Sequence, residues 1–386
     1  MKNNIFKKLA FSSMLCGSLL VAGNVKIATD GTGDFLTAPF YEAKNDVCSE
    51  LKVFNTNESS SILAKVSIRE QISSQEVDFP IFLSPGDVWA GTICEEGEGR
   101  VVLRSIDDSN HPSIAEVLAS GKDLNAHSRN AKHLENIDFS RGYVEIYPIA
   151  QFDEGSTNKV QKPVLHKRWE QLTNGNSSDS KLRKSGVDED SLSGVISFVT
   201  EQRETASIAM VAFENTHSKQ RTGTSIAYSE DTSPELLLGQ SEKVQILKLL
   251  QNSTTSFVYD NFGQDQYVYL TFPFGYTADQ QREVKVIVRD MSENKDTPKE
   301  LIFSPRPASN KYVINNELVV IPVSELIATT QNSSNYEKGM IQLKGIKNVS
   351  NHQLGAGETA SFIPSVVSTM TGSSTFINTV VKAAVK

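Results

Sequence analysis

Cysteine is scarce in this chain, and so is any arrangement of histidines that would hold a metal. Three cysteines in 386 residues are too few for a miniprotein built on disulfides or for an array of zinc sites. No pair of the six histidines shows the His-x-x-x-His spacing that places two imidazoles on one helix face. His111, His127 and His133 form the only cluster in sequence, and ordinary surface positions account for them better than a metal site.

Long apolar runs and basic blocks are missing as well. Beyond the N-terminal segment, no apolar run reaches about 18 residues, the length at which a membrane-spanning helix is considered. The formal net charge is -8 and no sizeable basic block is present, so nucleic acid is not an expected partner. An apolar fraction of 38% excludes wholesale disorder, and 386 residues suffice for two domains or one elaborate domain.

Linear motifs for catalysis are absent too. A serine-hydrolase elbow requires Gly-x-Ser-x-Gly, because its strained turn leaves no room for larger side chains. The nearest segment, at 223–227, lacks the second glycine. Ser178 and Lys181 have the Ser-x-x-Lys spacing, but they lie in a polar stretch where chance matches are common. We therefore predict no catalytic residue, and the chain fits a non-enzymatic protein better than an enzyme.

The N-terminus has the pattern of a secretory signal peptide. Lysines at positions 2, 7 and 8 precede a short apolar segment over 9–22 that ends in small residues. We place cleavage after Gly23, with cleavage after Ala22 as the alternative. A membrane anchor is the competing interpretation, but the apolar segment is short of the roughly 20 residues that span a bilayer. We predict export to the periplasm, the cell surface or the medium, and a mature net charge of -11 once three lysines are removed.

Cleavage would remove Cys16 and leave Cys48 and Cys94. Two cysteines in an oxidising compartment most simply form one disulfide, whereas two buried free thiols are the alternative. Cys48 opens the second expected strand and Cys94 closes the fifth, so both fall at the same end if each turn reverses the chain. Such a bridge would close a loop of about 47 residues and contribute roughly 2–4 kcal/mol.

Alternation with period two runs through residues 34–107, broken by turns rich in Ser, Asn, Gly and Pro. Apolar side chains at 62, 64, 66 and 68 share one face of a strand, and Lys65, Ser67 and Arg69 point the other way. Six such short strands favour an antiparallel β-sandwich, immunoglobulin-like in general shape. They include strands over 62–69, 77–83, 88–94 and 101–106, with Leu51 and Val53 in an earlier strand.

The remainder of the chain predicts more strands and a few short helices. A helix starting near 112 and another over 163–172 interrupt the strands, and a third is expected over 241–251. Residues 206–213 are apolar on both faces, as in a central strand. The fold class is mainly β, with α+β as the alternative. We divide the chain into a signal peptide (1–23), an N-terminal sandwich domain with a helical insertion (24–172), a polar linker (173–194) and a C-terminal β-rich domain (195–386).

Calcium is a minor hypothesis for the segment DGTGD at 30–34. Asp30, Thr32 and Asp34 place oxygen atoms on alternate residues, with glycines that let the backbone turn around an ion. The EF-hand pattern is incomplete, because no glutamate closes it. A solvated acidic turn is the competing interpretation and the more common one.

Aromatic residues raise the question of sugar stacking. Trp89, Trp169 and the ring-bearing positions of 267–276 could form a platform for a carbohydrate. Aromatic residues that alternate along a strand more often pack in a core, and we expect Trp89 to lie inside the sandwich.

Several segments have distinctive strand and turn signatures: GDFLTAP (33–39), VFNT (53–56), AKVSIRE (64–70), LSPGDVW (83–89), GYVE (142–145), TFP (271–273) and FSPRP (303–307). They resemble segments of a group of exported proteobacterial proteins of unassigned function. The resemblance implies a secreted, β-rich protein and carries over no site residues.

Two functions remain. The leading hypothesis is an exported non-enzymatic protein with a structural, adhesive or assembly role at the cell surface or in the periplasm. The alternative is a carbohydrate-binding or carbohydrate-active protein, with structural calcium in some versions. Either would have a protein or glycan partner outside the cytoplasm and no integral membrane span after cleavage.

Overall fold

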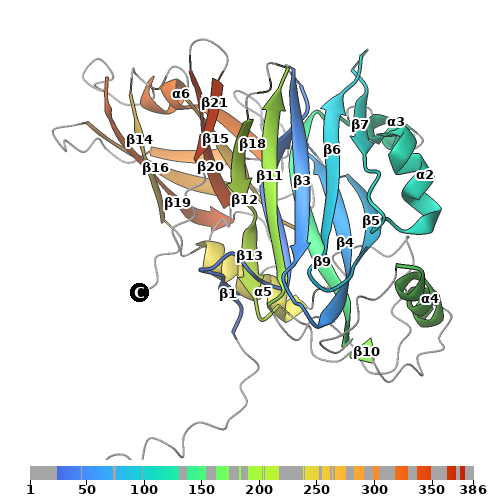
Figure 1. The fold of residues 1–386 in the computed structure, drawn as a ribbon. Coiled ribbons are helices and arrows are strands. Elements are labelled where there is room, and N and C mark those ends of the chain that lie inside the picture. The colour runs from blue at the N-terminus through green and yellow to red at the C-terminus, as the bar shows by residue number, and fades with distance from the viewer. Residues whose placement is uncertain are drawn as a thin grey trace, which may run out of the picture.

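In the part of the chain that the structure describes, the fold has four antiparallel sheets and five short helices (Figure 1). The computed structural model describes residues 24–44, 46–72, 75–97, 99–129, 137–153, 162–173, 182–183, 190–201, 203, 205–216, 238, 240–251, 254–260, 263, 266–274, 282–290, 299–303, 318–328, 337–348, 363–370 and 374–378. The predicted signal peptide at 1–23 lies outside the described residues and stays a prediction.

Two of the sheets form the first sandwich. Sheet A has the order β1 (Lys26–Ile27), β13 (Val211–Glu214), β2 (Phe35–Glu42), β9 (Arg141–Asp153), β4 (Ser60–Glu70) and β5 (Glu76–Leu83), and β10 (Leu182–Arg183) also pairs with β9. Sheet B has the order β12 (Thr205–Ala209), β11 (Leu192–Thr200), β3 (Val47–Asn55), β6 (Val88–Glu95), β7 (Val101–Arg104) and β8 (Lys122–Asp123).

Alternating apolar side chains build the core between sheets A and B. Leu36 and Val66 from sheet A meet Leu51 and Ile196 from sheet B in one buried cluster. Trp89 on β6 is fully buried there, and its indole N–H donates to Asn110 Oδ1 over 2.8 Å. The expectation that Trp89 packs within the sandwich is confirmed.

The other two sheets form the second sandwich. Sheet C has the order β14 (Thr254–Tyr259), β19 (Gly339–Asn348), β16 (Arg282–Asp290) and β17 (Lys299–Phe303). Sheet D has the order β18 (Leu318–Pro322), β15 (Gln266–Thr271), β20 (Ile363–Met370) and β21 (Ser374–Asn378). Their shared core includes Phe257, Val286 and Ile341 from sheet C and Val268 and Leu270 from sheet D, and α6 (Val323–Ala328) closes one end of it.

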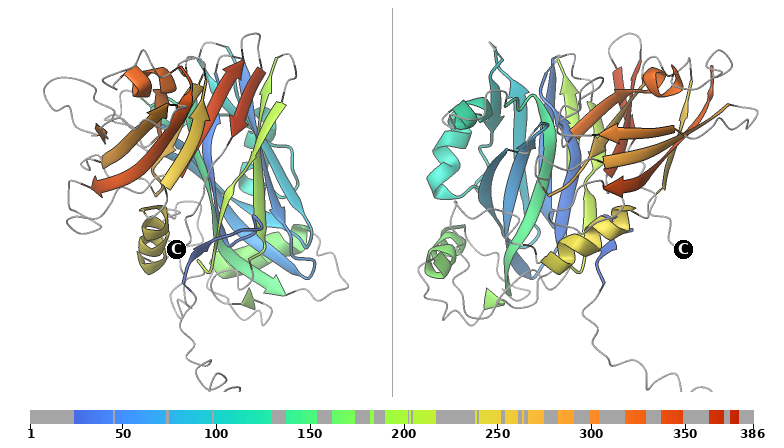
Figure 2. Two further views of the ribbon diagram at one scale, coloured as in Figure 1. Left: turned by 90° about the vertical axis from the view of Figure 1, so that its left-hand side faces the viewer. Right: turned by 180° about the vertical axis from the view of Figure 1, so that it is seen from behind.

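Sheet D is the sheet of the second sandwich that packs against the first. Strands β15 and β20 approach β2, and β21 approaches β12. Figures 1 and 2 show the consequence: sheet C lies on the side of sheet D that is away from the first sandwich.

Four further helices lie around the sandwiches: α2 (Pro112–Ser120), α3 (Leu124–Arg129), α4 (Lys162–Thr173) and α5 (Gln240–Gln251). Helix α2 begins with proline at its first position, where a missing N–H is harmless. Its N-cap is His111, whose Nδ1 accepts the backbone N–H of Ser113 over 3.2 Å. The helices expected near 112, over 163–172 and over 241–251 are confirmed.

Prolines mark irregularities in sheet A. The register of β2 against β9 changes between Ala38 and Tyr41, and Pro39 lies within this stretch. The register of β4 against β9 shifts between Leu63 and Ala64, and Ala64 pairs with Pro148. Proline cannot donate to a ladder, so it is tolerated at such bulges.

One expected strand is in fact two. The stretch 206–213, expected as a single central strand, breaks at Met210 into β12 and β13, which belong to different sheets. The backbone N–H of Met210 donates to Gly194 O over 2.9 Å, so the chain crosses from sheet B to sheet A beside β11. Strand β12 is an edge strand, and β13 lies next to the edge strand β1.

Strands on both sides of the polar segment 173–194 share a sheet. Strand β11 pairs with β3 from Leu192↔Asn55 to Thr200↔Val47. By sheet membership, the chain therefore passes from the first sandwich to the second between β13 and β14, later than the linker that the sequence suggests.

The mainly β, antiparallel fold class is confirmed by these sheets. The more specific likeness to immunoglobulin domains stays a prediction.

Candidate functional site

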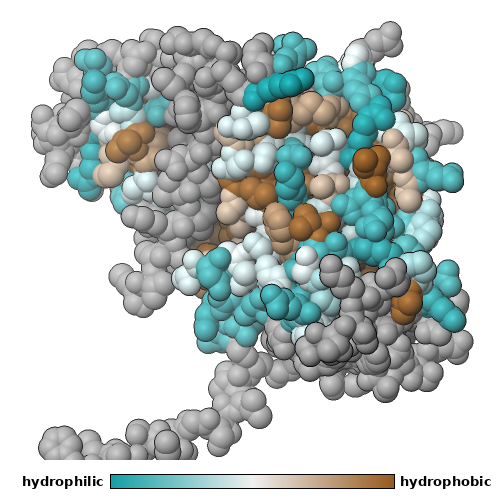
Figure 3. Space-filling view, in the orientation of Figure 1, coloured by the Kyte–Doolittle hydropathy of each residue, from teal (hydrophilic) through white to brown (hydrophobic). Residues whose placement is uncertain are grey.

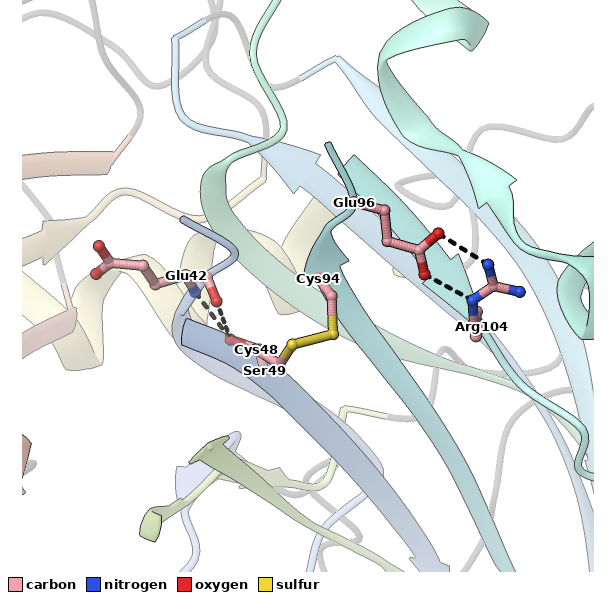
Figure 4. The surroundings of a disulfide bond; sticks show 6 residues. All are labelled: Glu42, Cys48, Ser49, Cys94, Glu96 and Arg104. Carbon is pink, nitrogen blue, oxygen red and sulfur yellow. Dashed lines mark hydrogen bonds and ion pairs between the residues drawn. A yellow bond between two sulfur atoms is a disulfide. The ribbon is translucent and has the colours of Figure 1, made fainter. Parts of the chain in front are cut away.

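The disulfide joins neighbouring strands of one sheet. Cys48 on β3 and Cys94 on β6 are bridged, with their Cα atoms 4.5 Å apart (Figure 4). Ser49 pairs with Ile93, so Cys48 lies directly across from Cys94. A separation near 4.5 Å is typical of antiparallel pairs that exchange no backbone hydrogen bonds. The prediction of this disulfide is confirmed.

The residue after Cys48 connects the two sheets of the first sandwich. Ser49 Oγ donates to Glu42 O over 2.7 Å and accepts the Glu42 N–H over 2.9 Å (Figure 4). Glu42 ends β2 in sheet A, and Ser49 lies near the start of β3 in sheet B. A single hydroxyl thus satisfies both backbone groups of Glu42 where the chain turns from one sheet to the other.

The carboxylate of Glu42 reaches the second sandwich. Arg141 Nη2 donates to Oε1 over 2.7 Å, and the Tyr269 hydroxyl donates to Oε2 over 3.0 Å. Although burial alone would lower it, the pKa of Arg141 is raised because Glu42 stabilises the cation. Burial and then the charge of Glu42 raise the pKa of Tyr269, so the phenol stays a donor at physiological pH.

A second carboxylate, on strand β9, also accepts hydrogen bonds from both sandwiches. Glu145 is fully buried, and its Oε2 accepts from Arg69 Nε and from the Tyr147 hydroxyl, both over 2.7 Å. Its Oε1 accepts the backbone N–H of Phe274 over 2.9 Å, and Phe274 follows β15 of the second sandwich. Arg69 also contacts Glu76 through Nη2 over 2.7 Å.

Apolar and hydroxyl contacts fill the space between these two carboxylates. The rings of Phe40 and Tyr269 stack with centroids 4.2 Å apart. The Thr271 hydroxyl donates to Pro39 O. We call the group around Glu42 and Glu145 the junction, with the residues Pro39, Phe40, Glu42, Arg69, Arg141, Glu145, Tyr147, Tyr269, Thr271 and Phe274.

The chemistry of the junction is that of packing. Each of its two carboxylates accepts hydrogen bonds from both sandwiches. Breaking a buried pair such as Arg69–Glu145 costs about 3–5 kcal/mol, because it leaves an uncompensated charge. The junction therefore fastens the two sandwiches together.

The sequence did not identify the junction. Lys65 and Arg69 were placed correctly on the face of β4 opposite the apolar one, but alternation does not reveal that this face is buried too. A usable signal existed: Arg69 of β4 lies directly across from Glu76 of β5, and Lys65 forms a diagonal ion pair with Asp78.

A second polar cluster ties α4 to the first sandwich. Lys162 Nζ donates to the Asp87 carboxylate, to Phe82 O over 2.7 Å and to Ser109 Oγ over 2.7 Å. Although burial raises it, the pKa of Asp87 is lowered overall because Lys162 stabilises the anion. Ser109 Oγ in turn lies 3.4 Å from the Asp87 carboxylate, so Lys162, Ser109 and Asp87 form one connected polar cluster.

Two histidines lie beside this cluster. The rings of His111 and His166 are 6.3 Å apart, and the ring of Phe82 contacts both. Of these two, only His111 belongs to the histidine cluster seen in the sequence. The part of the chain that the structure describes holds no group of three or more His, Cys, Asp or Glu side chains suited to a metal ion.

The residues of the calcium hypothesis have different surroundings. The exposed Asp30 carboxylate accepts from the Thr32 N–H over 3.0 Å and from the Thr32 hydroxyl over 2.9 Å. These bonds lower the pKa of Asp30. Asp34 is fully buried, and its Oδ2 accepts the Thr216 N–H over 3.1 Å. Asp30 thus closes a local turn and Asp34 supports the core; calcium at this segment stays an untested prediction.

Three of the aromatic residues proposed as a sugar platform are core residues, whereas the side chain of Trp169 and residue Tyr276 lie outside the described part of the chain. Trp89, Tyr269 and Phe272 are at most 3% exposed, which leaves none of the three an open ring face. Residues 178–181 and 223–227, considered above for catalysis, lie outside the described residues.

The outer face of sheet B is open to solvent. Its polar groups include the half-exposed Glu50–Lys52 ion pair at 2.9 Å and the exposed Ser207, whose hydroxyl is hydrogen-bonded to that of the buried Ser197 over 2.8 Å. In Figure 3, the apolar side chains on this side of the molecule form small separate patches among polar ones. The most exposed large apolar residues of the described part are Ile106, at 90%, and Val258, at 74%.

Comparisons with known proteins give no relative: no family model, no curated protein and no solved structure matches the chain. Among the helices of the described residues, none is long and apolar enough to cross a membrane.

Proposed function

We propose that the chain is an exported, non-enzymatic protein with a structural, adhesive or assembly role at the cell surface or in the periplasm. The observation that carries this proposal is the junction. Its two carboxylates, Glu145 fully buried and Glu42 largely so, and their cationic and phenolic partners hold one sandwich against the other. A body built in this way can present sheet edges and loops to partners while its core stays fixed.

The disulfide supports the export half of the proposal. Structural disulfides form and persist in oxidising compartments and are rare in the reducing cytosol. The bridge between Cys48 and Cys94 therefore fits a protein that folds outside the cytoplasm. The basic and apolar N-terminal sequence supports the same compartment.

Immunogold labelling of the source cells tests the proposal. Intact cells, permeabilised cells and thin sections are labelled with one antibody, and an antibody against a cytoplasmic protein serves as the control for leakage. Label on intact cells, or at the envelope after permeabilisation, is the expected result. Label spread through the cytoplasm would overturn the export half. Sugar turnover or release of a small product by the purified protein would overturn the non-enzymatic half.

A further inference from the structure

Along the main paths of the four described sheets, eight strands are terminal, and five of them have features that prevent pairing with another chain. Strands β1 and β8 are two residues long. Strand β5 carries Glu76, Asp78 and Pro80, and β17 begins with Lys299 and Glu300. Strand β18 ends in a proline and runs directly into α6. Short length, charge and proline are the usual means by which sheet edges avoid association.

Two of the remaining edges lie beside each other. Strands β12 (TASIA) and β21 (STFIN) have no charged residue, but they approach one another where the two sandwiches meet. The position of β21 next to β12 is visible in Figure 1. Each of these uncharged edges is thus covered by the other sandwich.

Strand β14 is the edge that has neither protection. Its sequence, TTSFVY, contains no charge, no glycine and no proline, and five of its six residues are β-branched or aromatic. Among the described strands, β14 pairs with β19 alone, and it lies on the side of the molecule away from the first sandwich (Figure 1). Val258 in this strand is 74% exposed. Its carbonyl accepts a long hydrogen bond from Gln266 Nε2, over 3.5 Å.

Charge decides what can cover this edge. No charge lies along β14 itself, and Asp260, just after it, is paired with Lys338 of the same sheet over 3.2 Å. A second β14 laid antiparallel against the first therefore brings no like charges together. It also supplies the uncharged, β-forming strand that the edge requires.

We infer that β14 pairs with β14 of a second copy, joining the two C sheets into one continuous sheet across a two-fold axis. The contact uses the same strand in both copies, so association closes at the dimer. Residues that lie opposite each other in an antiparallel pair point to the same face of the sheet. Val258, on the outer face, therefore lies beside position 256 or 254 of the other copy. The inference deepens the proposed assembly role and rests on it for its meaning, but its test needs only purified protein.

Sedimentation velocity of the purified full chain over a range of concentrations provides the test. The variants are Val258→Lys, Val258→Thr and Ile106→Lys. Lysine on the edge blocks strand pairing and is expected to weaken the dimer by at least about tenfold. Threonine keeps a β-branched, uncharged strand and retains the dimer. Ile106→Lys is the matched control, because Ile106 is even more exposed but lies on the loop after β7.

The wild-type protein is expected to be a dimer that only Val258→Lys dissociates, with far-ultraviolet circular dichroism unchanged in every variant. A wild-type chain that is monomeric at all concentrations overturns the inference and leaves the edge to a strand of a different protein. A dimer that Val258→Lys leaves intact overturns it too, as does equal dissociation by Ile106→Lys or Val258→Thr. None of these results affects the cell labelling, so the two proposals fail separately.

Discussion

The Tyr269 hydroxyl of the second sandwich donates to the Glu42 carboxylate of the first over 3.0 Å. Glu42 is also held through its backbone by Ser49, the residue next to the bridged Cys48. The contact between sandwiches is therefore connected, through two hydrogen-bonded residues, to the strand pair that the disulfide joins. Substitutions that each remove one polar group can therefore measure how much the junction contributes to the free energy of unfolding.

Tyr269→Phe removes one hydroxyl from the junction and keeps the ring that stacks on Phe40. Glu42 Oε2 then loses a donor in a largely buried place, so we expect the free energy of unfolding to fall by about 1–3 kcal/mol. Urea denaturation followed by tyrosine and tryptophan fluorescence measures it. The matched control is Tyr267→Phe, the same deletion at a half-buried position on β15, for which a smaller change is expected. Equal losses in both variants would contradict the role given to the Tyr269–Glu42 bond.

Glu145→Gln tests the other carboxylate of the junction. It removes the charge that faces the buried Arg69 and keeps the shape of the side chain, so we expect a loss of about 3–5 kcal/mol in the free energy of unfolding. Glu50→Gln is the control, because it breaks the half-exposed pair with Lys52 and should change stability by less than about 1 kcal/mol. A tolerated Glu145→Gln would mean that the Arg69 cation is compensated without Glu145.

The disulfide leads to two linked predictions, one for its removal by substitution and one for its reduction. Replacing Cys48 and Cys94 together by alanine is expected to lower the free energy of unfolding by about 2–4 kcal/mol, because the bridge restricts the unfolded chain over 46 positions. Dithiothreitol should destabilise the wild-type protein by a similar amount and leave the double variant unchanged. The measurement is the urea midpoint with and without reductant. A double variant that still responds to reductant would contradict this account.

Local alternation was enough to predict much of the fold. The strands over 62–69, 77–83 and 88–94 match β4, β5 and β6 closely, because each has one apolar face and a turn at each end. The disulfide followed from the same reasoning, since counting strand reversals places Cys48 and Cys94 at one end.

Features that depend on distant parts of the chain were not predictable in this way. Periodicity over 206–213 is continuous, yet the chain changes sheets at Met210, because that choice depends on whether β11 or β2 is the neighbour. The contacts of the junction could not be predicted from the sequence for a related reason. Glu42 and Tyr269 are 227 positions apart, and nothing near either residue indicates the other.

The last prediction concerns acid. His166 on α4 is packed against Phe82 and His111, and its Nε2 is buried without a hydrogen-bond partner. Burial, followed by the nearby His111 and Lys162, lowers the pKa of His166, while Glu170 and Asp108 oppose the shift. The folded protein therefore favours the neutral ring.

Below the ordinary histidine pKa of about 6.5, the unfolded chain binds a proton at this position that the folded protein does not. Stability from His166 is thus full above that pH and falls as the pH drops toward the lowered pKa of the folded state. We expect the wild-type protein to lose more stability between pH 7.5 and pH 5.5 (about two units across the titration) than His166→Gln does. Urea unfolding at both pH values gives the two differences. Equal losses in the two proteins would show that the imidazole of His166 is not held neutral, and a larger loss in His166→Gln would reverse the sign argued here.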